Sequence, residues 1–147
     1  MNGSLALIGS GEYLPAMAKF EGSLIADGVK NGKAARYLQI PTAAGRESAD
    51  RLEYWRSLGQ RQADALGVEC TYLPIYARED AFNQEYVDAV ANSALMYMSG
   101  GDPHHLAETL IDTPLWSAML ENWVTGASLA GCSAGAMVLS SQIPTFR

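Results

Sequence analysis

Short apolar runs alternate along the chain with longer segments in which apolar residues recur every three or four positions. The apolar runs predict buried strands, at residues 5–8, 36–40, 68–73, 94–98 and 128–131. The longer segments predict helices with one apolar face, which span residues 15–27 and 49–66 or begin at residues 84, 103 and 114. Strands that alternate with helices are typical of a parallel sheet with helices on both faces. The pattern therefore predicts a three-layer α/β domain.

Residues that favour helix ends stand where the predicted helices begin and end. Side chains that cap helix N-termini precede four of the helices, at Ser48, Asn83, Asp102 and Thr113. The last two are each followed by proline, which is favoured at the first helical position. Glycine, which is frequent just past the last turn, is expected to end three helices, at Gly28, Gly67 and Gly126.

The predicted strands at residues 5–8, 94–98 and 128–131 carry no charged side chain, which predicts that they lie in the middle of the sheet. The chain contains no internal repeat, low-complexity segment or linker, so we expect a single domain over residues 1–147. Parallel strands place the loops at their carboxyl ends along one edge of the sheet, where ligands bind. Glu12, Arg46, Gly100 and Ser133 belong to loops of this kind.

The balance of charge limits which partners are expected. The chain has ten Lys and Arg against sixteen Asp and Glu, for a net charge of −6, and no two basic residues are adjacent. Nucleic acids and anionic membranes bind clustered basic residues, so neither is expected as the main partner. No apolar stretch approaches the roughly 20 residues of a membrane span. Two cysteines are too few for a disulfide framework, so we expect a cytoplasmic protein with reduced thiols.

Residues 131–135 read Gly-Cys-Ser-Ala-Gly and separate an apolar run from a segment of small, helix-compatible residues. Gly-x-Ser-x-Gly in this setting is typical of a nucleophile elbow, a sharp strand-to-helix turn that presents the serine. We predict that Ser133 is a nucleophile and that the N–H of Ala134, at the helix N-terminus, faces a developing oxyanion. Cys132 precedes the serine, so its side chain should point away from the apex. The alternative is a turn of small residues without any chemistry.

A second glycine pair, Gly100 and Gly101, follows the predicted strand at residues 94–98, just as the elbow follows the next strand. Glycine lets a backbone N–H approach a substrate oxygen closely, and an oxyanion hole needs two donors aimed at one point. The N–H of Gly100 or Gly101 and that of Ala134 are predicted to be this pair. Taken alone, Gly-Gly-Asp-Pro is also an ordinary strand–helix turn.

Together these segments resemble the serine peptidase family of dipeptidase E and cyanophycinase. The resemblance rests on residues 8–12, 99–102 and 129–136, and it extends over essentially the whole chain. It implies a fold like that of class I glutamine amidotransferases, with serine in place of cysteine. It also implies hydrolysis of small peptides next to acidic residues, such as Asp-Xaa dipeptides or β-aspartyl-arginine links. In such an enzyme Ser133 would be the nucleophile, and Gly101 and Ala134 the oxyanion donors.

The chain departs from this family at two places. Pro103 stands where cyanophycinases commonly have glutamine, so the resemblance does not carry a substrate contact over to that position. The family's histidine and acid lie downstream of the serine, whereas the fourteen residues after Ser133 include no His, Asp or Glu. We therefore expect residues 1–147 to be the N-terminal portion of a longer hydrolase domain, associated with a second copy or a retained C-terminal fragment. The alternative is a non-catalytic binding or assembly module of the same fold.

Other residues are candidates for a base, a thiol or a substrate contact. His104 and His105 are the only histidines, and either is an alternative base. Adjacent histidines diverge on a helix, so no metal site is predicted. Cys132 is an alternative nucleophile if its thiolate is exposed. Arg46 is the candidate for binding an acidic side chain, and Asp102 is a second candidate for substrate contact. No cofactor is expected, because the first loop lacks the third glycine of a dinucleotide-binding motif.

Overall fold

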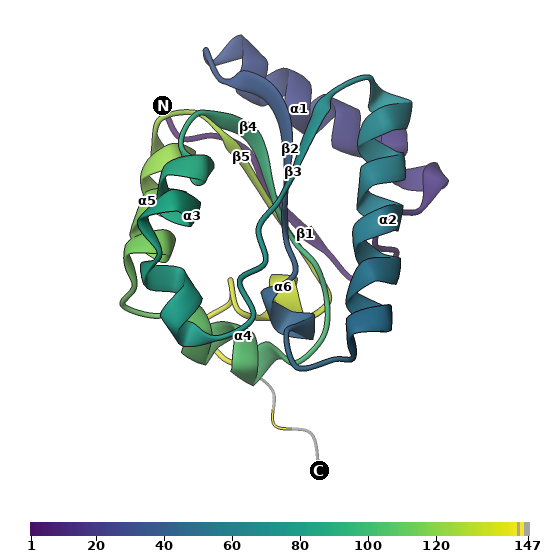
Figure 1. The fold of residues 1–147 in the computed structure, drawn as a ribbon. Coiled ribbons are helices and arrows are strands. Elements are labelled where there is room, and N and C mark those ends of the chain that lie inside the picture. Colours follow the sequence, from purple (N-terminus) through teal and green to yellow (C-terminus); the bar gives the residue numbers. More distant parts are fainter. Residues whose placement is uncertain (144, 146–147) are drawn as a thin grey trace.

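Five parallel strands form the centre of the protein (Figure 1). The structure is a computed structural model, and it describes residues 1–143 and residue 145. The strands are β1 (Leu5–Ile8), β2 (Ala34–Ile40), β3 (Glu69–Tyr72), β4 (Ser93–Met98) and β5 (Ser128–Cys132). Their order across the sheet is β1-β5-β4-β2-β3, and every neighbouring pair is parallel. The predicted parallel α/β architecture is confirmed.

Helices cover both faces of this sheet (Figure 1). The α-helices are α1 (Ala18–Lys30), α2 (Ala49–Leu66), α3 (Gln84–Val90), α4 (Pro103–Leu110), α5 (Pro114–Val124) and α6 (Ala134–Met137). Short 3-10 helices precede α1, α2 and α3, and they are η1 (Pro15–Met17), η2 (Thr42–Ala44) and η3 (Arg78–Phe82). Helices α1 and α2 lie on one face of the sheet, and α3, α4 and α5 lie on the other. The three layers that the pattern predicts are therefore present.

The two faces of the sheet bury different kinds of side chain. Leu38 and Met96 point toward α3, α4 and α5, into a core of aliphatic residues and methionines. Their neighbours Tyr37 and Tyr97 point toward α1 and α2, because successive strand residues face opposite sides. Tyr13 joins these two tyrosines, and the three ring centroids lie 5.1 to 6.3 Å apart. One face is thus lined by aliphatic side chains, and the other contains a buried tyrosine cluster.

The predicted helix caps are confirmed, with one exception. Four side chains accept backbone N–H bonds in the first turns of α2, α3, α4 and α5, and they are Ser48, Asn83, Asp102 and Thr113. Gly67 ends α2 in the left-handed conformation, with φ of 68°. Gly126, with φ of 117°, comes just after α5.

The exception is Gly28, which lies inside α1 and does not end it. Helix α1 continues to Lys30, and Asn31 is its C-cap. Gly28 faces the sheet, and a Cβ at this position would lie 2.5 Å from the carbonyl oxygen of Ala94 on β4. The glycine therefore allows close approach of α1 to the sheet. Packing of this kind depends on tertiary structure. The helix-end preference of glycine therefore predicted the end of α1 wrongly.

The predicted position of the uncharged strands is wrong for one of the three. Strands β4 and β5 lie inside the sheet, but β1 lies at its edge in the described part of the chain. Leu5 and Leu7 on β1 are 50% and 58% exposed. The interior place belongs instead to β2, whose Arg36 pairs with Glu69 at 3.5 Å on the neighbouring strand. The absence of charged side chains in a strand therefore did not predict whether that strand lies inside the sheet or at its edge.

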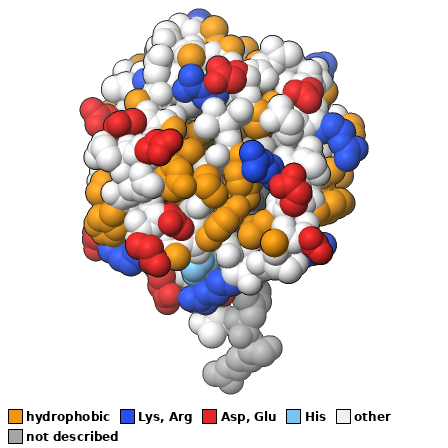
Figure 2. All heavy atoms as spheres, in the orientation of Figure 1, with side chains coloured by type: hydrophobic (Ala, Val, Ile, Leu, Met, Phe, Trp, Pro, Cys, Tyr) orange, Lys and Arg blue, Asp and Glu red, His pale blue; other side chains and the backbone are white. Residues whose placement is uncertain are grey.

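Charged side chains of both signs are dispersed among hydrophobic ones on the face drawn in Figure 2. None of the helices over residues 1–143 is both long and apolar enough to cross a membrane. The same residues contain no group of three or more His, Cys, Asp or Glu side chains that is placed to hold a metal ion.

Candidate active site

Ser133 lies at the turn between β5 and α6, as the elbow pattern predicts. Its backbone has φ of 53° and ψ of −113°, which residues other than glycine rarely adopt. The Ser133 N–H donates to the carbonyl oxygen of Ile8 at 2.8 Å and so ties the turn to the end of β1. The strained turn holds the serine at the carboxyl edge of the sheet, where it lines a cleft.

Both glycines of the motif are required by the packing of the elbow. A Cβ on Gly131 would lie 2.3 Å from the carbonyl oxygen of Gly135. A Cβ on Gly135 would lie 2.2 Å from the carbonyl oxygen of Met98. Each clash is with backbone, which cannot yield without displacing a strand or helix in a closely packed interior. The glycines therefore let α6 start directly on the ends of β4 and β5.

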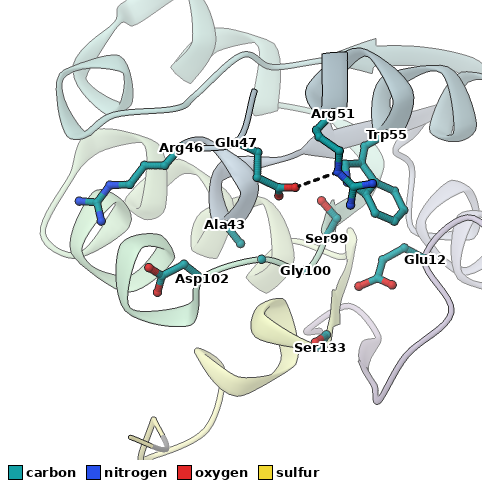
Figure 3. A pocket seen from close by; sticks show the side chains of 11 residues that line it. Glu12, Ala43, Arg46, Glu47, Arg51, Trp55, Ser99, Gly100, Asp102 and Ser133 are labelled. Carbon is teal, nitrogen blue, oxygen red and sulfur yellow. Dashed lines mark hydrogen bonds and ion pairs between the residues drawn. The ribbon is translucent and has the colours of Figure 1, made fainter. Parts of the chain in front are cut away.

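A cleft of about 540 Å³ opens in front of Ser133 (Figure 3). Its lining comes from the ends of β1, β2, β4 and β5 and the start of α2, and consists of Glu12, Ala43, Arg46, Glu47, Arg51, Trp55, Ser99, Gly100, Gly101, Asp102 and Ser133. The structure thus brings five predicted site residues to one cleft. The sixth, Ala134, follows Ser133 directly and is buried. This is the carboxyl-edge location expected for a parallel sheet.

Backbone N–H groups near Ser133 are candidates for an oxyanion site. Within the described residues, the N–H groups of Gly100, Gly101 and Ala134 have no hydrogen-bond acceptor. Gly101 has φ of 146°, and a Cβ there would lie 2.4 Å from the carbonyl carbon of Ala43, so the position requires glycine. Available donors from two adjacent loops therefore lie near the serine, as oxyanion stabilisation needs.

The Asp102 carboxylate already has partners within the fold. Its Oδ1 accepts the backbone N–H groups of His104 at 2.9 Å and His105 at 3.1 Å. The hydrogen bond from His105 is the main cause that lowers the pKa of Asp102, and the charge of Arg46 adds to it. Figure 3 shows Arg46 on the same side of the cleft as Asp102, away from Ser133. A substrate contact by Arg46 or Asp102 stays a prediction.

Helix α2 and the residue before its N-cap form part of the cleft, which was not predicted from the sequence. Glu47, Arg51 and Trp55 line one wall, and Arg51 Nε lies 3.4 Å from Glu47 Oε1. The Arg51 guanidinium carbon also lies 5.4 Å from the centre of the Trp55 ring. These residues recur every four positions from the loop after β2, so they share one side of the helix. That spacing was the available signal in the sequence.

Glu12 enters the cleft from the loop after β1 (Figure 3). A Cβ on Gly100 would lie 2.5 Å from Glu12 Oε1 and 3.2 Å from Ser133 Cβ, so both side chains flank the same glycine. The loop has positive φ at Gly11 (101°) and at Tyr13 (58°), on either side of Glu12. Tyr13 is buried in the tyrosine cluster. The sequence placed Glu12 at the correct edge of the sheet but gave no reason to assign it a role.

Cys132 lies behind the elbow and does not line the cleft in the described structure. Its side chain is fully buried on the α1 and α2 face, as its position before the serine predicts. Burial, followed by the nearby charge of Glu12, raises the pKa of the Cys132 thiol to about 12. A reactive cysteine needs an accessible thiolate, so these surroundings disfavour Cys132 as the nucleophile.

Neither histidine lines the cleft in the described part of the chain. His105 is buried, and its Nε2 lies 2.7 Å from the carbonyl oxygen of Tyr76. His104 lies in the first turn of α4, where its backbone N–H is bonded to the Asp102 cap. The alternative in which one of them is the base for Ser133 therefore gains no support from the geometry.

The chain has a class I glutamine amidotransferase-like fold, in which a parallel sheet lies between two layers of helices and carries a serine elbow at its carboxyl edge. The chain belongs to peptidase family S51, whose sequence profile matches residues 5–147. This confirms the resemblance to the family of dipeptidase E and cyanophycinase.

Two solved structures are similar to this chain. A peptidase from an acI-B1 actinobacterium has 63% sequence identity and a TM-score of 0.97, and the match covers 99% of this chain and 59% of that one. A protein provisionally named peptidase E, from Listeria monocytogenes EGD-e, has 24% identity and a TM-score of 0.68, with 97% and 64% covered. The chain thus spans less than two thirds of either relative. None of the curated proteins matches it.

Proposed function

We propose that this protein is a serine hydrolase of small peptides with Ser133 as its nucleophile. The observation that carries the proposal is the strained elbow, which holds Ser133 at a cleft beside N–H groups that lack an acceptor in the described residues. Ser133 Oγ would attack the scissile carbonyl, and the resulting oxyanion would accept hydrogen bonds from Ala134 and from Gly100 or Gly101. Membership of peptidase family S51 supports the same chemistry.

A serine nucleophile needs a base within hydrogen-bond reach and a group that orients the base. The described cleft lining includes no histidine. In this proposal the base and its partner therefore come from residues outside the described cleft. The two solved relatives have longer chains than the part matched here, which is compatible with such a contribution.

We further propose that the substrates are short peptides with an acidic residue, such as Asp-Xaa dipeptides or β-aspartyl-arginine. The cleft volume of about 540 Å³ lies in the range of small-molecule sites. Arg46 and Arg51 both line it, and either guanidinium can bind a carboxylate through two parallel hydrogen bonds. Arg51 lies on the wall above Ser99 and Glu12 in Figure 3, so the pair offers two positions for an acidic group.

The proposal is tested by labelling the full-length natural protein with a fluorophosphonate serine probe. We expect one probe per chain, mapped to Ser133 by peptide mass spectrometry. Ser133→Ala should abolish the label, while Ser57→Ala, at an exposed serine on α2 outside the cleft, should leave it unchanged. Absence of label in the wild type, or label that persists in Ser133→Ala, would overturn the proposal.

A non-catalytic binding module of the same fold is the second candidate, and the lack of a histidine in the described cleft favours it. Hydrolysis of Asp-Xaa dipeptides by the full-length protein distinguishes the serine hydrolase from the binding module. Turnover that disappears in Ser133→Ala supports the enzyme. Peptide binding without turnover or labelling supports the binding module.

A further inference from the structure

Glu12 is the cleft residue whose chemistry the proposed reaction leaves unused. Its side chain is half-buried and shares the surface of Gly100 with Ser133. The ion pairs found in the described structure are Arg36 with Glu69 and Arg51 with Glu47, so Glu12 has no cationic partner there. A half-buried carboxylate beside the nucleophile is therefore left with its charge unpaired.

The fold holds Glu12 in this position from two sides. Along the chain, Gly11 and Tyr13 have positive φ, and the Tyr13 ring packs against Tyr37 and Tyr97. From behind lies the buried Cys132, whose thiol pKa is raised by burial and by the nearby charge of Glu12. The buried neighbours limit the freedom of the side chain, so the carboxylate is already placed before any ligand arrives, and less conformational entropy is lost on binding.

We propose that the Glu12 carboxylate binds the free α-ammonium group of a short peptide whose first carbonyl lies at Ser133. This inference rests on the proposed function, and it makes Glu12 a specificity residue that selects substrates with an unblocked N-terminus. Arg46 lies across the cleft from Glu12, whereas Arg51 lies above Glu12 in Figure 3, and both provide positive charge for the substrate's carboxylate. With Arg46 as the partner of that carboxylate, a short peptide would bind with its opposite charges on opposite sides.

The short distance between Glu12 and Ser133 favours an α-ammonium over an arginine side chain as the bound cation. In the first residue of a peptide, the amino nitrogen is two bonds from the carbonyl carbon that the serine attacks. Glu12 and Ser133 flank a single glycine, which matches that short separation. A guanidinium at the end of an arginine side chain is several bonds further from any scissile carbonyl, so it would reach past Glu12.

The test uses the full-length natural protein with Ser133→Ala, so that binding is measured without turnover. Dissociation constants for Asp-Leu, N-acetyl-Asp-Leu and N-acetyl-Asp-Arg are determined by calorimetry. The Ser133→Ala protein is compared with the Ser133→Ala protein that also carries Glu12→Gln. Glu53→Gln is the matched control, because it removes one carboxylate from an exposed position outside the cleft. Ser133 labelling is measured in parallel on the same Glu12 and Glu53 variants with Ser133 intact.

We expect Glu12→Gln to weaken binding of Asp-Leu by about tenfold or more, because a hydrogen bond to a charged group is lost. Binding of the two acetylated peptides should change by less than about twofold, as should every affinity in Glu53→Gln. A loss confined to N-acetyl-Asp-Arg would overturn the α-ammonium assignment, because the guanidinium is its only cation. Equal affinity of Asp-Leu with and without Glu12 would overturn the inference altogether.

Labelling separates this inference from the proposed function. Probe rates in Glu53→Gln should stay within about twofold of wild type, because this carboxylate lies outside the cleft. Loss of labelling in Glu12→Gln would mean that Glu12 acts on the elbow, which contradicts the inference. Absence of labelling in the wild type would instead refute the hydrolase proposal, while the calorimetric comparison still decides what Glu12 binds.

Discussion

The elbow at residues 131–135 and the loop at residues 99–102 both place glycines at the carboxyl ends of neighbouring strands, yet Gly100 of the loop serves a different purpose from the two elbow glycines. At the elbow, a Cβ on Gly131 or Gly135 would meet backbone within 2.3 Å. At the loop, a Cβ on Gly100 would meet the side chains of Glu12 and Ser133. The difference separates glycines that the fold requires from a glycine that the site requires, although all of them occur in the motifs that indicate function.

Gly135→Ala should have the largest effect and should act on stability. The new methyl group would lie 2.2 Å from the Met98 carbonyl oxygen, so the start of α6 would have to move off the sheet. We expect the free energy of unfolding to fall by about 3 kcal/mol or more, measured by urea denaturation. Gly9→Ala is the control, because a Cβ there has no neighbour within 4 Å. A Gly135→Ala variant as stable as that control would show that the elbow tolerates a side chain.

Gly100→Ala should leave the fold intact and impair the site. Its Cβ would displace the Glu12 carboxylate and crowd Ser133, whose Cβ would lie 3.2 Å away. A misplacement of this size at a reacting centre costs about 10²-fold in rate, so we expect peptide hydrolysis by the full-length protein to fall by that factor. The unfolding midpoint should stay close to wild type. Full activity in this variant would show that the site does not require glycine at position 100, which contradicts the proposed difference between Gly100 and the elbow glycines.

Arg51→Ala and Arg46→Ala should have smaller effects, which differ between acidic and neutral substrates. Each removes a positive charge from the lining of the cleft. We expect KM for Asp-Xaa dipeptides to rise about fivefold to tenfold, with little change for neutral dipeptides. Arg61→Ala, on α2 but outside this cleft, is the control. Equal changes for acidic and neutral substrates would exclude the substituted arginine from acidic recognition.

The smallest expected effect concerns Cys132, the elbow residue that sits behind the serine. Burial raises the pKa of its thiol to about 12, so the native protein contains almost no Cys132 thiolate at pH 7 to 9. Native-state alkylation by iodoacetamide should therefore be slow and should accelerate on unfolding in urea. Because the folded state favours the neutral thiol, its contribution to stability is complete below pH 9 and declines as pH rises toward 12. Rapid alkylation of the native thiol at pH 7 would revive Cys132 as a nucleophile.

Local patterns predicted the elements of this fold well, because each depends on residues close together in sequence. The four N-caps and the position of Ser133 are examples, since a cap or a sharp turn is specified within a few residues. The same rules misplaced the end of α1, because the space around Gly28 depends on β4. They also misplaced β1, because strand order is set by crossover connections and is not written in any one strand.

The candidate site was predictable where motifs carry it and not where separate loops meet. Ser133, Gly100 and Gly101 could be identified because each belongs to a motif of small residues that directly follows an apolar run. Glu12 becomes meaningful only when the structure sets it against Gly100, which lies far away in sequence. Arg51 belongs to a helix whose polar residues resemble any solvated face until the cleft is located. Convergence of distant loops is a property of the three-dimensional fold, so sequence reasoning could name the edge of the sheet but not the partners gathered there.

The backbone hydrogen bond from the Asp102 N–H to the Ala43 carbonyl oxygen, at 2.8 Å, has a consequence for protein engineering. It fastens the glycine loop to η2 through main-chain atoms, just as the Ser133 N–H fastens the elbow to Ile8. Neither attachment depends on a side chain, so neither is lost when side chains at the cleft rim are exchanged. Positions 46, 47, 51 and 55 can therefore be randomised together in a library that seeks new peptide preferences, while the nucleophile keeps its place.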